Sequence, residues 1–146
     1  VATGIFDDML MNADSRITSD GSAVILTTKG LADALTYDLK EKYKVIMPWE
    51  TLFEGLDVAK YNGVTIARVS IWDRMIRAYE NNGTVLNKPY RAVYANINNL
   101  QTATDADGLI SDLDIWFDKK ERRNYVYSTG RIGTMILEDD MFHAAY

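Results

Sequence analysis

The sequence contains no cysteine, so disulfides, thiolate zinc sites and cysteine nucleophiles are all excluded. It contains a single histidine, His143, which closes off a histidine-based catalytic triad and a metal site built from several histidines. There is no glycine-rich phosphate-binding loop, and carboxylates adjacent in sequence, such as Asp7 and Asp8, would point to opposite faces of a strand. We therefore expect no catalytic residues, no cofactor, no metal and no enzyme activity.

The sequence also lacks a long apolar run. None approaches the roughly 18 residues of a membrane span, so we expect no membrane partner. The start, VATGIFDDML, is acidic where a secretion signal is basic, and it lacks an initiating methionine, so we expect a soluble, trimmed or processed fragment of a longer protein. The 16 basic and 21 acidic residues give a net charge of −5 and no overall attraction to nucleic acid, so specific nucleic-acid binding is not expected.

What is present is typical of a folded protein. The 146 residues are 47% hydrophobic and 11% aromatic, which is enough for a real core. No internal repeat, low-complexity tract or linker interrupts the chain. We expect one domain over residues 1–146.

Helical periodicity appears in two longer segments, residues 29–42 and 71–82, and a short helix is expected near the N-terminus. Thr28 is placed to cap the first long helix, and Ser70, with Asp73 three residues on, to cap the second. Gly83 is expected to end the second helix. In each long helix apolar residues recur at every fourth position and share one face: Leu31, Leu35 and Leu39 in the first, and Ile71, Met75 and Tyr79 in the second.

The rest of the chain is predicted to be mainly strands. AVILTT reads as a buried strand that runs into the first long helix. Asn62-Gly63 separates two strand-like runs and is a strong signal for a tight hairpin. Apolar and polar residues alternate in YRAVYANI and LDIWFD, and NYVYST and IGTMILE follow. The predicted fold class is α+β, with a mostly antiparallel central sheet flanked by two main helices.

The stretch TATDADGLISDLD, residues 102–114, has carboxylates spaced around Gly108 nearly as in a calcium-binding EF-hand loop. Aligning Gly108 with the invariant glycine of that loop places Ala103 first, where a carboxylate is needed, and Asp114 last, where a bidentate Glu is needed. Strand-like sequences flank the stretch where helices should be. We interpret it as a solvated connection between strands.

The densest basic cluster comprises Lys119, Lys120, Arg122 and Arg123, and two tyrosines follow it. The favoured interpretation is a charged hairpin turn between LDIWFD and NYVYST. One alternative is a small patch for single-stranded nucleic acid with stacking aromatics. Another is a salt-bridging surface that faces an acidic neighbouring subunit.

The order of these pieces resembles the C-terminal half of a tailed-bacteriophage major capsid protein of the Hong Kong 97 type. In that family an Asn-Leu pair and a loop containing Thr-Asp often precede a strand pair, and a glycine-containing strand and a final apolar segment follow it. The family's N-terminal arm, extended loop and long spine helix have no counterpart in this sequence. The matching residues are Asn99-Leu100, Thr104-Asp105, Trp116 to Asp118, Gly133, and Phe142 to Tyr146.

This resemblance implies the axial domain of a phage or prophage capsid subunit with part of its peripheral domain. Such a protein is structural, is made in the cytoplasm of the bacterial host and is located in the virion capsid. Its partners would be copies of itself in the capsomer, together with other phage shell proteins. The alternative function is a small binding module for single-stranded nucleic acid at residues 119–123.

For the subunit contacts we expect the basic cluster to pair with carboxylates of a neighbouring copy. Such pairing would weaken as the salt concentration rises. The acidic candidates are Asp105, Asp107, Glu138, Asp139 and Asp140.

Overall fold

The computed structural model describes residues 2–104 and 112–146. The chain divides into two compact units, one formed by Val1–Asn99 with Glu138–Tyr146 and the other by Leu100–Leu137. The second unit is an excursion from the first, because the chain leaves the first unit after Asn99 and re-enters it at Glu138. The single domain expected over residues 1–146 stays a prediction.

The first unit is built on a six-stranded sheet with the order β10-β5-β1-β4-β3-β2. Only β1 and β4 pair in parallel, and the other neighbours are antiparallel, so the predicted α+β class with a mostly antiparallel sheet is confirmed. The strands are β1 (Ala23–Thr27), β2 (Glu50–Phe53), β3 (Leu56–Tyr61), β4 (Val64–Val69), β5 (Ala92–Asn96) and β10 (Phe142–Ala145).

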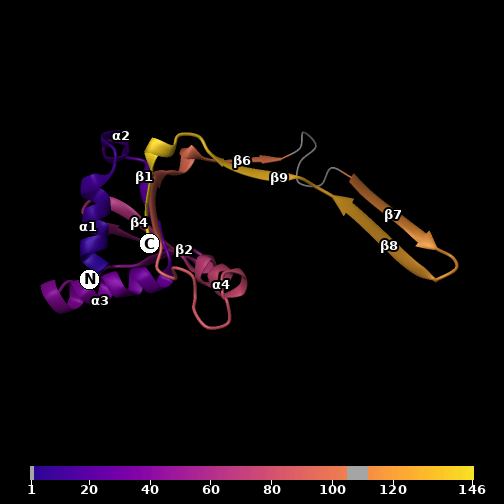
Figure 1. Ribbon diagram of the computed structural model, residues 1–146, viewed down its shortest axis with the longest axis horizontal. Helices are drawn as coiled ribbons and strands as arrows, with labels where there is room; N and C mark the ends of the chain where they lie inside the picture. The colour runs from indigo at the N-terminus through magenta and orange to yellow at the C-terminus, as the bar shows by residue number, and fades with distance from the viewer. Residues whose placement is uncertain (1, 105–111) are drawn as a thin grey trace. The chain divides into compact units, whose positions relative to one another are not determined.

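Four α-helices accompany this sheet in the described part of the chain. Two of them match the predicted long helices, and α1 matches the helix expected near the N-terminus, although with 11 residues against 10 in α4 it is not a minor element. Figure 1 shows α1 and α3 on the same side of the sheet. The helices are α1 (Ala2–Asn12), α2 (Ser15–Thr18), α3 (Lys29–Tyr43) and α4 (Ser70–Tyr79), with short 3-10 turns η1 (Ile97–Asn99) and η2 (Asp139–Met141).

The core lies between the sheet and the helices α1 and α3. Ile25 on β1 faces Ile66 on β4 and Tyr94 on β5 in the strand register, and all three side chains are buried. Phe6 from α1 and Leu35 from α3 are fully buried in the same cluster. Each such side chain contributes roughly 1.5–3 kcal/mol to the stability of the unit.

The predicted hairpin at Asn62-Gly63 is confirmed, because β3 and β4 pair on either side of it. Asn62 has a φ of 48° and Gly63 a φ of 83°, the left-handed conformation that a tight two-residue turn requires at both positions. This local chemistry fixes the register of the two strands.

Helix α4 departs from its prediction in length and in orientation. It ends at Tyr79 rather than at Gly83, because Asn81 and Asn82 bond backbone N–H groups of the following residues and form turns there. Only Ile76 of this helix is buried. The predicted apolar stripe therefore faces outward and does not pack on the sheet.

The capping residues also differ from prediction. Thr28 and Val69 occupy the N-cap positions of α3 and α4, and neither makes a side-chain cap hydrogen bond. The first N–H groups of α3 are capped from α4, where the Asp73 carboxylate accepts from the N–H of Lys29 at 2.8 Å and of Gly30 at 3.4 Å. At the start of α3 a long-range contact thus replaces the predicted local cap.

The second unit consists of two two-stranded antiparallel ribbons. Strand β6 (Leu100–Thr104) pairs with β9 (Ile132–Ile136), and β7 (Asp112–Asp118) pairs with β8 (Arg123–Thr129). No residue of this unit that the structure describes is buried. The unit therefore has no hydrophobic core of its own in its described part.

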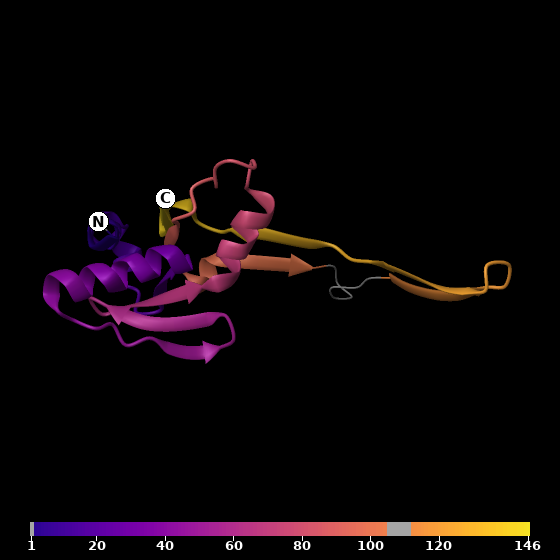
Figure 2. The ribbon, with the colours of Figure 1, turned by 90° about the horizontal axis from the view of Figure 1, so that it is seen from below.

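Asn99 joins the two ends of the first unit where the excursion begins and ends. Its buried side chain donates to the backbone oxygens of Glu138 at 2.9 Å and Met141 at 3.2 Å. Its Oδ1 accepts from the Glu138 N–H at 2.8 Å. This amide fixes the returning chain directly before β10. Figure 2 shows the yellow C-terminal segment back at the first unit, where the C-terminus is marked.

Candidate interaction site

The predicted basic cluster lies at the closed end of the β7–β8 hairpin. Strand pairing ends with Asp118 opposite Arg123, and residues 119–122 form the turn, so the predicted charged hairpin turn is confirmed. The Asp118 carboxylate stabilises this turn, because its Oδ1 accepts from the N–H groups of Lys120 at 2.7 Å and Glu121 at 3.4 Å. The turn chemistry is local, which is why the sequence could predict it.

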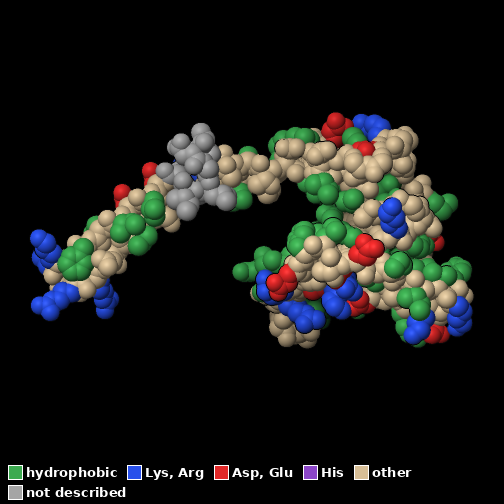
Figure 3. All heavy atoms as spheres, turned by 180° about the vertical axis from the view of Figure 1, so that it is seen from behind, with side chains coloured by type: hydrophobic (Ala, Val, Ile, Leu, Met, Phe, Trp, Pro, Cys, Tyr) green, Lys and Arg blue, Asp and Glu red, His purple; other side chains and the backbone are tan. Residues whose placement is uncertain are grey.

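The four basic side chains of this turn are all exposed. Within the described part of their unit none of them forms an ion pair. Figure 3 shows Lys and Arg side chains gathered at this closed end of the hairpin. The positive charge is therefore available to a partner. The residues are Lys119, Lys120, Arg122 and Arg123.

The strand register divides the side chains of this hairpin between two faces, since opposite residues of an antiparallel pair point to the same side. The aromatic face carries Trp116 opposite Tyr125 and Asp114 opposite Tyr127. The apolar face carries four large side chains that are each between 56% and 67% exposed. These side chains are Leu113, Ile115, Phe117 and Val126.

The aromatic face is held together by its own contacts. The rings of Trp116 and Tyr125 stack with centroids 5.6 Å apart and planes 16° apart. The Tyr125 hydroxyl donates to the Glu121 carboxylate, and this hydrogen bond raises the pKa of the Tyr125 phenol. Such a stacked pair contributes about 0.5–1.5 kcal/mol, so this face stabilises the hairpin from within.

The apolar face has no comparable partner in the hairpin. A two-stranded ribbon is marginally stable in water unless further strands or a helix cover its apolar side. Adjacent exposed apolar side chains of this kind mark interaction surfaces. The arrangement is chemically suited to binding another macromolecule, with an apolar contact along the strands and charge at the tip.

The acidic candidates lie elsewhere. Asp105 and Asp107 fall outside the described residues. Glu138 and Asp140 gather around Arg16, whose Nη1 is 3.1 Å from the Glu138 carboxylate and whose Nη2 is 3.9 Å from that of Asp140.

Two further carboxylates complete this acidic cluster. Asp14 also pairs with Arg16, and hydrogen bonds from the backbone and side chain of Arg16 lower the pKa of Asp14. Asp139 is exposed and forms no ion pair in the described part of its unit. Three carboxylates paired with one guanidinium, with Asp139 next to two of them in sequence, leave the cluster negatively charged, so it can still attract a cationic partner.

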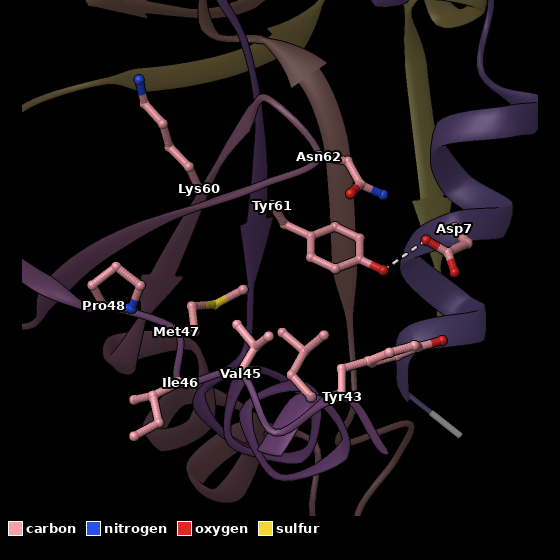
Figure 4. Close-up of a pocket in the computed structure, with 10 residues that line it drawn as sticks. Asp7, Tyr43, Val45, Ile46, Met47, Pro48, Lys60, Tyr61 and Asn62 are labelled. Carbon is pink, nitrogen blue, oxygen red and sulfur yellow. Dashed lines mark hydrogen bonds between the residues drawn. The ribbon is translucent and has the colours of Figure 1, made fainter. Parts of the chain in front are cut away.

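A surface hollow of about 500 Å³ lies beside the end of α3 and the β3–β4 turn. Its polar contact is the hydrogen bond from the Tyr61 hydroxyl to Asp7 Oδ1, 2.7 Å long, and burial and this bond raise the pKa of Tyr61. Figure 4 shows Lys60 extending away from that pair. The remaining lining is mainly apolar, contributed by Leu39, Tyr43 and residues 45–48.

Two exposed apolar surfaces of the first unit were missed by the sequence reasoning. The stripe on α4 was recognised as apolar, but periodicity cannot say which way a helix turns its stripe. The short strand β2 was not predicted, because its sequence ETLF has neither clear alternation nor a strong turn on its N-terminal side.

Over residues 2–104 and 112–146, no group of three or more His, Asp or Glu side chains is arranged to hold a metal ion. None of the described helices is both long and apolar enough to cross a membrane. No protein-family model, no curated protein and no solved structure matches this chain.

Proposed function

We propose that this chain is a structural protein that associates with copies of itself, as part of a phage or prophage major capsid subunit of the Hong Kong 97 type. The observation that carries the proposal is the β7–β8 hairpin, whose apolar face is bare in a unit with no buried described residue. Exposed apolar side chains of this kind are the surface that subunits of an assembly cover when they associate.

The size of the hairpin's apolar face fits a shell in which each contact between subunits is weak. The apolar face consists of four large side chains, far fewer than the roughly 20–30 residues that each partner contributes to a standard interface, so a single contact of this face is weak. Many weak contacts, repeated by symmetry, give an assembly its stability. The basic tip adds charge that would favour an acidic neighbour such as the cluster around Arg16.

Sedimentation velocity over a concentration series tests the proposal. We expect the wild-type chain to form oligomers that dissociate on dilution and as salt rises. Replacing Ile115 and Val126 together by Thr keeps β-branched side chains but removes apolar area from the apolar face. This double variant should need about tenfold more protein, or higher, to associate. Tyr127→Thr, on the aromatic face, is the matched control and should behave as the wild type.

Electron microscopy of the associated protein separates a capsid subunit from other oligomers. Rings or shells of one size support the capsid proposal, whereas irregular aggregates speak against it. A wild-type chain that stays monomeric throughout the concentration series contradicts self-association itself.

A module that binds single-stranded nucleic acid is the second candidate. The stacked Trp116–Tyr125 pair favours it, together with the four cations nearby that form no ion pair with the described residues of their unit. Titration with a single-stranded oligonucleotide tests it. Four phosphate contacts predict a slope of about −3 in log affinity against log salt. Absence of binding at low salt removes this candidate.

A further inference from the structure

The dipeptide Asn-Gly occurs twice in this chain, as Asn62-Gly63 and Asn82-Gly83, and all four residues are exposed. An asparagine side chain can be attacked by the backbone nitrogen of the next residue, and glycine allows the closest approach because it has no Cβ. Around both glycines the structure leaves the space of a Cβ open, with nothing within 4 Å. The two dipeptides therefore share one chemistry, and their surroundings decide which of them reacts.

The reaction is a deamidation, with water as its only co-reactant. The glycine nitrogen bonds to Cγ of the asparagine while the Cγ–Nδ2 bond breaks, and the leaving nitrogen takes the glycine amide proton and departs as ammonia. Water then opens the succinimide ring at either of its carbonyl carbons and leaves an aspartate or an isoaspartate. Negative charge develops on Oδ1 during the attack, so N–H groups that already point at this oxygen lower the barrier.

At Asn82 such N–H groups are in place. Its Oδ1 accepts from the N–H of Thr84 at 3.2 Å and from that of Val85 at 2.9 Å. The N–H of the attacking Gly83 donates to Asn81 Oδ1 at 2.8 Å, which polarises the bond that must give up its proton. The donors lie at the oxygen that becomes negative, and the acceptor lies at the nitrogen that loses its proton.

The loop that carries Asn82 is also able to change shape. It lies between α4 and β5, and an isolated β-bridge between Asn81 and Leu86 closes it. Residues 81–85 are exposed. Formation of the succinimide ring rotates the backbone about the Cα–C bond of Asn82, and an exposed loop with few buried contacts opens at little cost in free energy.

Asn62 lies in a more restrictive turn. Tyr61 and Val64 pair directly on either side of the dipeptide, and β3 and β4 are both inner strands of the six-stranded sheet. Asn62 holds the positive φ of 48° that this two-residue turn requires. The same backbone rotation has to separate the ends of β3 and β4 here, so we expect this turn to slow the reaction about tenfold or more.

We propose that Asn82 is a site of spontaneous deamidation in the folded chain, and that the fold protects Asn62 from the same reaction. The modification replaces a neutral amide by a carboxylate three residues after Tyr79, the last residue of α4. Negative charge is unfavourable near the C-terminal end of a helix, so the product destabilises this end of α4. The inference goes beyond the proposed self-association and needs no partner.

Peptide mapping by mass spectrometry measures both sites in one sample. Trypsin cleaves after lysine and arginine except before proline, so Asn62 and Asn82 fall in separate peptides, 61–68 and 78–91. The full-length chain is incubated at mildly alkaline pH, folded in dilute buffer and unfolded in concentrated guanidinium chloride, and fragment spectra locate the converted residue.

In the folded chain we expect Asn82 to convert at least about tenfold faster than Asn62, because only Asn62 has to wait for strands to separate. In the unfolded chain both sites are open, and we expect their rates to agree within a few-fold. We also expect conversion at Asn82 to be at least as fast in the folded chain as in the unfolded one, because the fold supplies the donors to its Oδ1.

Two variants test the assignment and the role of the surrounding hydrogen bonds. Asn82→Gln keeps an amide, but its longer side chain would have to close a larger ring, so conversion in peptide 78–91 should nearly stop. Asn81→Ala removes the acceptor of the Gly83 N–H and should slow conversion at Asn82 a few-fold while the rate at Asn62 stays unchanged. Far-UV circular dichroism checks that each variant folds.

The outcomes separate this inference from the proposed function. A ratio below about tenfold between Asn82 and Asn62 in the folded chain overturns the protection of Asn62. Slower conversion at Asn82 in the folded than in the unfolded chain overturns Asn82 as an activated site, because its hydrogen bonds then hold the amide in place and do not promote attack. Either result leaves self-association untouched, and a wild-type chain that stays monomeric contradicts self-association but not the deamidation.

Discussion

The cap that Asp73 provides for α3 predicts a measurable loss of stability when it is removed. In Asp73→Ala the N–H groups of Lys29 and Gly30 lose their acceptor, which costs about 1 kcal/mol for a typical N-cap. The carboxylate also lies at the positive end of the α3 dipole and in the first turn of α4, which adds about 0.3–1 kcal/mol. The better helix propensity of Ala in α4 offsets part of this, so we expect a net loss of about 1–1.5 kcal/mol.

Urea unfolding followed by circular dichroism measures this loss. For a slope of about 1–2 kcal/mol per molar urea, the midpoint should fall by about 0.5–1.5 M. Asp73→Asn keeps an oxygen acceptor and loses only the charge, so we expect roughly half of the effect. Ser70→Ala removes the residue that the sequence predicted as a cap, and because its hydroxyl caps nothing we expect a change within about 0.5 kcal/mol. Equal midpoints for Asp73→Ala and the wild type would refute the remote cap.

Three further perturbations follow from other contacts. Asn99→Ala removes three hydrogen bonds of a buried amide and should lower the free energy of unfolding by about 2–3 kcal/mol in urea. Hydrogen bonds from Thr51 and Arg68 lower the pKa of Asp57, so they stabilise the fold at pH values above the unfolded-state pKa. At neutral pH the wild type should therefore be more stable than Asp57→Asn. Urea unfolding over a pH series should show this difference disappearing below about pH 4. Trp116→Ala removes the stacked pair, and amide hydrogen exchange in β7 and β8 should speed up about two- to tenfold, whereas unchanged exchange would contradict a stabilising stack.

The elements that the sequence predicted are those set by neighbouring residues. Asn62-Gly63 fixed the β3–β4 hairpin because both residues adopt positive φ, and the Asp118 turn followed from the same kind of local chemistry. The leucines of α3 repeat on one face, and Leu31 and Leu35 are indeed buried. Local propensity and periodicity are enough to predict such elements without information from the rest of the chain.

What the sequence missed depends on partners distant along the chain. Strands β2 and β6 have weak patterns of their own and exist because β3 and β9 pair with them. The orientation of α4 is set by Asp73 at the start of α3, a contact that no spacing within α4 indicates. For the candidate site, the basic turn was found from the sequence, whereas the outward stripe of α4 and the edge at β2 needed the fold.

The excursion at residues 100–137 sets an order of events during folding. Strand β10 can pair with β5 only after the long segment between them has brought its two ends together, and the entropy cost of closing this loop slows that step. The β7–β8 hairpin is the most local pairing of the excursion and can form in about 1–10 μs, after which β6–β9 and then the Asn99 amide draw the ends together. We therefore expect pulse-labelled hydrogen exchange to find β10 protected last. The strand that completes the sheet is then also the one most easily released from it.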